Sequence, residues 1–96
     1  MSASKLQDIK QCYITGQWYG DNGEPLERHH VLNGALRDFA EREGLWIWIT
    51  PQQHRILHDT KQGVYMLKLL KKIAQLTYEK EHTHDEWMSN VMKSYV

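Results

Sequence analysis

Residues 45–58 read LWIWITPQQHRILH and predict a strand that passes directly into a helix. Apolar side chains and two tryptophans alternate over residues 45–49, as is typical of a β-strand. Thr50 then has the side chain of a good N-cap, Pro51 suits the first helical position, and Gln53 stands at the capping-box position. We therefore expect a helix to begin immediately after this strand.

The predicted helix carries His54 and His58, which lie one turn apart and so share a face. An adjacent pair, His29-His30, stands upstream at the end of another predicted strand. An isolated His-x-x-x-His pair is most often only part of a polar helix face. Two helical histidines with a strand histidine, however, could hold one divalent metal ion and leave positions open for water and a phosphate oxygen.

The segment around His29-His30 predicts a β-hairpin. Residues 11–15 read as a short strand closed by Gly16, residues 20–25 are rich in turn-forming residues, and residues 26–32 read as the partner strand. Because side chains alternate along a strand, His29 and His30 are expected to face opposite sides unless the chain bends there.

Helices are expected over much of the remaining chain. Residues 33–43 predict a short helix ending at Gly44, residues 64–81 an amphipathic helix, and Thr83 with Glu86 a capping box that opens a final short helix. Residues 1–10 read as a frayed end or a short helix. The pattern predicts an α+β fold.

Composition places limits on the class of protein. The chain has 96 residues, of which 41% are hydrophobic and 25% charged, so one compact domain is the economical interpretation. No apolar stretch is long enough to span a membrane, and residues 1–10 lack the apolar centre of a signal peptide, so we expect a cytoplasmic protein. The lone Cys12 is expected to be a buried thiol. A net charge of zero argues against strong non-specific binding of nucleic acid.

Two stretches carry a family resemblance. Glu27-Arg28-His29-His30 resembles the acidic residue and double histidine of the HNH, or ββα-metal, nuclease family, and TPQQHRILH at residues 50–58 resembles its strand-to-helix closing motif. The likeness is closest to the colicin-type DNase motif and to small HNH-like proteins of phages and prophages. It implies one HNH-like domain over residues 1–96: a motif core at about 12–59, with a short β-hairpin and a metal-binding helix, and a helical extension at 64–96 with two C-terminal helices.

The resemblance also implies roles for individual residues. His29, His54 and His58 would ligate one divalent metal ion, and His30 would be the general base that activates water. Glu27 would orient or polarise the histidine pair without itself being a ligand. The metal is left open among zinc, nickel, manganese and magnesium, although three imidazoles suit the transition metals better than magnesium.

Arg55, next to His54, is a candidate for clamping a phosphate, and it is equally well explained as a residue of the solvent face. The family's central asparagine has no secure equivalent here. Asn33 is a candidate substitute, although a turn-forming role suits it better. The paired Cys-x-x-Cys knuckles found in many members are absent from this sequence.

The expected function is therefore that of a metal-dependent endonuclease that hydrolyses phosphodiester bonds, with DNA as the expected substrate. A dimer partner, or a phage recombination or packaging partner in the host cytoplasm, is compatible with the resemblance. Two alternatives stay open: an inactive HNH-fold protein that binds protein or nucleic acid, and a zinc-stabilised interaction module in which His30 is a fourth ligand. His82 and His84 are expected to be solvated, and Trp46 and Trp48 to serve packing.

Overall fold

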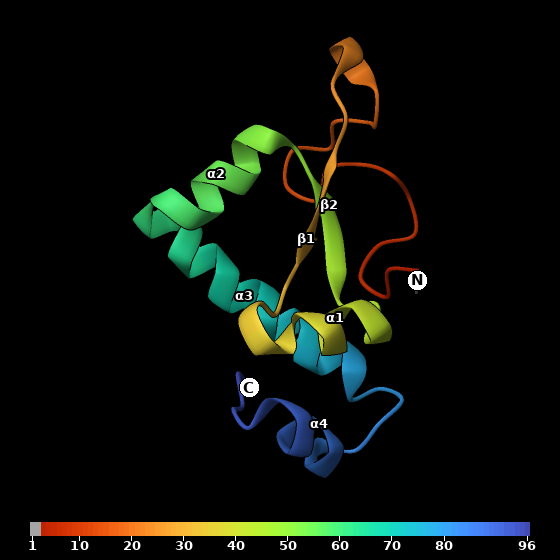
Figure 1. Ribbon diagram of the computed structural model, residues 1–96, viewed down its shortest axis with the longest axis vertical. Helices are drawn as coiled ribbons and strands as arrows, with labels where there is room; N and C mark the ends of the chain where they lie inside the picture. The colour runs from red at the N-terminus through yellow and green to blue at the C-terminus, as the bar shows by residue number, and fades with distance from the viewer. Residues whose placement is uncertain (1–2) are drawn as a thin grey trace.

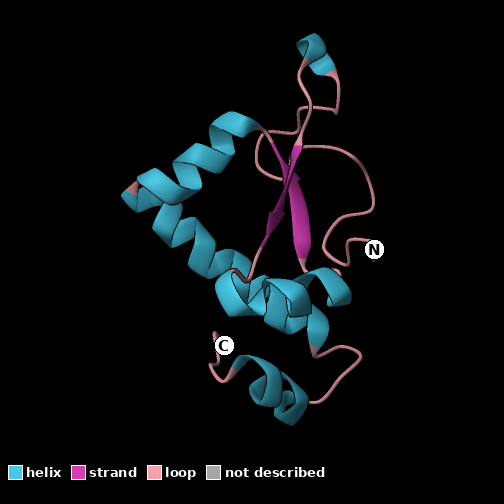
Figure 2. Cartoon of the chain, in the orientation of Figure 1, coloured by secondary structure: helices cyan, strands magenta, loops and turns pink. Residues whose placement is uncertain are grey.

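Two short strands, β1 (Glu27–His30) and β2 (Trp46–Ile49), pair antiparallel at the centre of the computed structural model, which describes residues 3–96 (Figure 1). Helices lie along one side and at one end of this pair, and the N-terminal segment runs along the other side, as Figure 2 shows; the α+β fold class is confirmed. The described helices are α1 (Arg37–Glu43), α2 (Pro51–Asp59), α3 (Lys61–Tyr78) and α4 (His84–Val91), with two 3-10 turns, η1 (Asp21–Gly23) and η2 (Gly34–Leu36).

The predicted hairpin partner of β1 is wrong. β1 pairs with β2, and residues 11–15 form no strand; Gln11 makes one isolated bridge to Trp18. The earlier segment folds back on itself through Gly16, whose φ of 82° is readily adopted by glycine, while the Tyr13 N–H donates to the Trp48 carbonyl at 2.8 Å. The segment therefore lies beside β2 without extending the ladder.

The register separates the two adjacent histidines, as the alternation predicts. His29 lies opposite Ile47, and His30 lies opposite Trp46, so the two imidazoles leave the sheet on different faces. The face of His29 is the inner one, where Ile47 and Ile49 are fully buried. His30 shares the outer face with Arg28, Trp46 and Trp48.

Local capping signals fix most helix ends as predicted. The Thr50 hydroxyl accepts from the Gln53 N–H at 3.1 Å, which starts α2, and α1 ends at Gly44 in the left-handed region. The capping box of Thr83 and Glu86 is complete and starts α4. By contrast, α3 begins three residues earlier than expected because Thr60 caps it, accepting from the Gly63 N–H. Residues 3–10 contain no helix.

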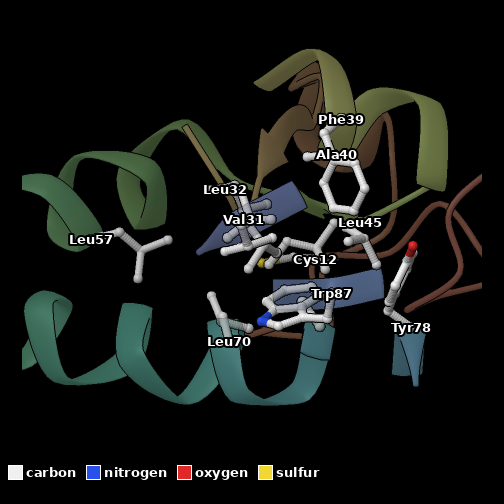
Figure 3. Packing of buried hydrophobic residues seen from close by; sticks show 14 of the residues in the cluster. Cys12, Val31, Leu32, Phe39, Ala40, Leu45, Leu57, Leu70, Tyr78 and Trp87 are labelled. Atoms are coloured by element: carbon white, nitrogen blue, oxygen red, sulfur yellow. The ribbon is translucent and has the colours of Figure 1, made fainter. Parts of the chain in front are cut away.

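A close approach of α2 and α3 sets the direction of the second helix. A Cβ atom at Gly63 would lie 2.0 Å from the Ile56 carbonyl oxygen and 2.6 Å from the Leu57 Cα, so only glycine fits there. Leu57 points from α2 toward α3 in Figure 3, and Leu70 faces it from α3. The two helices thus meet closely at the turn that joins them and diverge from it beside the sheet (Figure 1).

One buried cluster joins the sheet to the helices (Figure 3). It contains Ile47 from β2, Leu57 from α2, Leu70 from α3 and Trp87 from α4, and it also contains the predicted buried thiol of Cys12. The indole N–H of Trp87 donates to the Lys93 carbonyl at 2.9 Å, so this large side chain is both buried and satisfied. Among residues 3–96, every helix is too short or too polar to cross a bilayer.

Candidate metal centre

The structure brings together the three histidines predicted as ligands. His29 comes from the inner face of β1, and His54 and His58 come from one face of α2. Each offers one nitrogen, and these nitrogens all lie within 4.8 Å of one another. The ring centroids are 5.1 to 5.8 Å apart. Such a group of imidazoles is suited to a single divalent transition-metal ion.

The three candidate ligands differ in how deeply their side chains are buried. His29 is 4% exposed, His54 is half-buried and His58 is exposed. The His29 Nε2 atom is buried and makes no hydrogen bond within the described chain. An unsatisfied nitrogen of this kind is costly in an apolar surrounding and calls for a partner, which a metal ion would supply.

The same surroundings keep the His29 ring neutral. Burial, followed by the nearby charges of His54 and His58, lowers the pKa of His29 to about 4. A neutral imidazole presents a lone pair, which is the form that binds a metal ion. The donor set therefore fits a metal: three clustered imidazoles, the most buried of them neutral near physiological pH and unpartnered at Nε2.

Glu27 contacts a ligand from outside the set. Its Oε1 lies 3.0 Å from the Nδ1 atom of His54, whereas the sequence-based expectation was that it would act on the His29-His30 pair. Alternation explains the difference, because Glu27 leaves β1 on the same face as His29 and there meets α2. A carboxylate that accepts from Nδ1 holds the tautomer in which Nε2 keeps its lone pair.

His30 lies outside the group of three and has a different neighbour. Its Nε2 atom is 3.4 Å from the Oε1 of Glu41, a residue of α1 that sequence reasoning missed. The second oxygen of Glu41 accepts from Arg28 at 2.8 Å. Nothing local in the sequence marks Glu41, because it is one of several charged residues on a short helix and meets His30 only through tertiary packing.

Two hollows flank the histidines. The larger, of about 420 Å³, is lined by Glu27, Pro51, Asp59 and Arg55 together with His54 and His58. Arg55 is exposed there, so its predicted contact with a phosphate is sterically open. Placement in this hollow is compatible with either expectation for Arg55, a phosphate clamp or a solvent-facing side chain.

The second hollow, of about 240 Å³, brings the candidate base to the candidate metal ligands. It is lined by all four histidines and by Arg28, Asn33 and Arg37. Asn33 precedes η2 in an extended conformation, and its side chain forms no cap, which leaves both of its predicted roles open. Arg37 is a further cation that the sequence-based reasoning did not select. Convergence of the candidate base, the three candidate metal ligands and two arginines makes this hollow the better candidate for chemistry.

The other two histidines lie at the junction of α3 and α4. His82 stacks on Tyr78 with ring centroids 4.2 Å apart and lies between carboxylates of Glu43 and Glu86. His84 is exposed and lies 3.1 Å from Glu79. Within residues 3–96 the metal-compatible group is the one formed by His29, His54 and His58. His82 is thus more enclosed than the expected solvated residue, and His84 matches that expectation.

Comparisons with known proteins assign no family. No family model matches the chain, and no solved structure matches it. One curated protein, an arginine kinase from Stichopus japonicus, is 25% identical over an alignment of 79 residues, and the match covers 73% of this chain and 21% of that protein. The chain thus spans about a fifth of the length of that relative. At this identity and coverage the likeness carries no function over to the present chain.

Proposed function

We propose that this chain is a metal-dependent endonuclease of the HNH type that hydrolyses phosphodiester bonds in DNA. The observation that carries the proposal is the hollow in which His30 stands beside His29, His54 and His58. One strand histidine and two helical histidines one turn apart, in the order β1, β2, α2, follow the arrangement that the HNH resemblance implies. We also take the fold as a ββα-metal core extended by α3 and α4.

The three-histidine set supports a catalytic centre over a purely structural one. Structural zinc sites use four protein ligands, whereas catalytic sites use three and keep a position open. His30, the candidate fourth ligand, is not part of the close group and faces Glu41. The exposed His58 and the two adjoining hollows leave the ion accessible from solvent. This arrangement disfavours the zinc-stabilised interaction module.

Each residue then has a chemical task. His29, His54 and His58 would hold the ion, which when bound would supply positive charge to the phosphodiester and to its departing oxygen. His30 accepts the proton of the attacking water, as a neutral imidazole can do near physiological pH. Arg28, Arg37 and Arg55 provide cations for phosphate contacts despite the zero net charge of the chain.

We further propose that residues 1–96 act as one HNH-like unit, with the motif core at about 12–59 and the helical extension at 64–96. In support of this, Leu70 of α3 and Trp87 of α4 share the buried cluster with Ile47 of the sheet. An isolated core would expose these side chains to water, which is unfavourable for large apolar groups.

The decisive experiment compares wild type with His30→Ala on supercoiled and single-stranded DNA, with manganese, nickel, zinc and magnesium in turn. We expect wild type to cleave and His30→Ala to cleave at least about 100-fold more slowly while it still binds zinc. His84→Ala, which alters an exposed histidine far from the hollow in sequence, is the matched control and is expected to cleave like wild type. If wild type and His30→Ala show the same trace activity with every metal while both still bind the metal, the nuclease proposal is wrong and a binding protein is the better interpretation.

A further inference from the structure

Three half-buried polar side chains interact in a row on the outer face of the sheet, and the candidate base His30 is one of them. Arg28 Nη2 donates to Glu41 Oε2 at 2.8 Å, and Glu41 Oε1 lies 3.4 Å from His30 Nε2. The side chains of Arg28, Glu41 and His30 are 19%, 32% and 10% exposed. Two oxygens of one carboxylate thus serve two different residues of β1.

Glu41 is held in place from both sides of the contact. Arg28 lies over the Trp46 ring with its guanidinium carbon 3.9 Å from the centroid, so the arginine is fixed by an aromatic surface as well as by the carboxylate. Glu41 itself belongs to α1, which is closed by Gly44 and packed through Phe39 and Ala40. A carboxylate mounted on a helix and oriented by a fixed arginine is a rigid acceptor.

The Nε2 atom of His30 lacks a hydrogen-bond partner among the described residues, and the nearby Glu41 carboxylate can serve it only as an acceptor. This nitrogen is buried, and the Glu41 oxygen is within reach. A buried N–H without an acceptor is unfavourable, and contacts of catalytic groups are often long until substrate or ligand is bound. If Nε2 carries the proton and Glu41 accepts it, the lone pair of the imidazole is confined to Nδ1.

We propose that Glu41 is the positioning residue for His30: its carboxylate holds the ring in the tautomer protonated at Nε2 and so makes Nδ1 the nitrogen that accepts a proton from water. The inference rests on the proposed nuclease function for its catalytic consequence. It also gives this chain a substitute for the asparagine that the HNH resemblance leads one to expect. An orienting side-chain carboxylate takes over the task of presenting the base.

A simpler role has to be separated from this one. Glu41 could act only as the counter-charge of Arg28, a half-buried cation whose loss of partner is costly. In that case the His30 contact is incidental, and removing both charges together would restore normal behaviour. The two roles differ in what happens to the His30 tautomer, which an ion pair with Arg28 does not control.

The first test is spectroscopic and needs no activity. Zinc-loaded, ¹⁵N-labelled protein is examined by long-range ¹H–¹⁵N correlation at about pH 8, above the ordinary imidazole pKa of about 6.5. We expect His30 of wild type to be protonated at Nε2, and Glu41→Gln to show a mixture of tautomers. The matched control is Asp38→Asn, which neutralises an exposed acid on the same helix. A wild-type ring protonated at Nδ1, or an unchanged tautomer in Glu41→Gln, overturns the inference.

The second test is kinetic. Glu41→Gln is expected to lower kcat for DNA cleavage by at least about 10-fold with KM changed by less than about twofold, because the base and not substrate binding is affected. Glu41→Asp keeps the charge and should retain more of kcat than Glu41→Gln. Zinc titration should give the same affinity for all three proteins, since Glu41 is outside the ligand group.

The double variant Arg28→Met with Glu41→Gln guards against misfolding, because it removes the Arg28 charge together with the Glu41 charge. We expect its His30 tautomer to stay mixed; recovery of the wild-type tautomer would show that Glu41 serves Arg28 alone and would overturn the inference. An active wild type with unaffected Glu41→Gln kinetics also overturns it and leaves the nuclease function standing. If the wild type fails to cleave DNA with every metal tested, the nuclease function is wrong, and the catalytic role of Glu41 is wrong with it.

Discussion

The Oε1 atom of Glu27 lies 3.0 Å from the Nδ1 atom of His54, so a residue of β1 contacts a candidate metal ligand of α2. The contact joins β1 and α2, the two elements that carry the three clustered histidines, across 27 residues of the sequence. Because Nδ1 is engaged, His54 offers Nε2 to an ion. Glu27 is thereby expected to influence metal affinity through His54.

Glu27→Gln should weaken zinc binding by about 10- to 100-fold, the range typical of residues that orient a metal ligand. The amide can still contact His54 but no longer carries the charge that strengthens the ligand. Isothermal titration calorimetry measures the affinity, with Glu24→Gln as the control on a nearby acid of the preceding loop. Unchanged affinity in Glu27→Gln would show that the contact does not tune the metal site.

The pH dependence follows from His29. Its pKa is about 6.5 in the unfolded chain and about 4 in the folded one, so the unfolded state binds more protons between these values. The contribution of neutral His29 is fully present above about pH 6.5 and is lost as pH falls toward 4. Metal affinity should fall over the same range, because protons compete for the imidazoles.

Urea unfolding of the metal-free protein at about pH 7 and about pH 5 measures this effect. We expect wild type to lose more unfolding free energy on acidification than His29→Gln, by at most about 1.4 kcal/mol for each pH unit within the window. His84→Gln, at an exposed histidine, is the matched control. Identical slopes for wild type and His29→Gln would contradict the lowered pKa.

Local signals in the sequence were sufficient for most helices and for placing His54 and His58 on one helix face. The N-cap at Thr50 and the spacing of His54 and His58 depend only on neighbouring residues, and the structure confirms the helix. The partner of β1 could not be obtained in this way, because strand pairing is decided by tertiary burial. Residues 46–49 place two fully buried isoleucines on the inner face, whereas residues 11–15 turn back through Gly16.

The same limit explains the parts of the candidate site that the sequence did not reveal. Glu41 and Arg37 lie on α1. The sequence of this region predicts only a short helix that connects the two strands. Pairing of β1 with β2 brings α1 back beside His30, so Glu41 contacts His30 and Arg37 lines the same hollow. No spacing rule in the sequence encodes this arrangement. Glu27 was recognised as part of the motif, but the choice between His54 and the His29-His30 pair required the geometry of the sheet.

Gly63→Ala should destabilise the protein, although alanine normally favours a helix over glycine by up to about 1 kcal/mol. The added Cβ would lie 2.0 Å from the Ile56 carbonyl oxygen, a backbone atom that cannot turn away. Overpacking of this kind costs about 1–3 kcal/mol. Thermal and urea unfolding measure the change, and Gln62→Ala, at the exposed neighbouring position, is the control. A Gly63→Ala protein as stable as wild type would mean that α2 and α3 separate without cost.

Arg37 and Arg55 distinguish the two hollows as places for the scissile phosphate. Arg37 lines the hollow that contains His30, and Arg55 lines the one that does not. If hydrolysis uses the His30 side, Arg37→Gln should raise KM for DNA by about 10-fold, the loss expected for one charge-assisted contact, while Arg55→Gln raises it less. Each variant removes one positive charge, so both should lose the same amount of general attraction to DNA. Each variant is therefore the control for the other. A larger effect of Arg55→Gln would move the phosphate to the hollow beside Glu27 and would separate it from the candidate base.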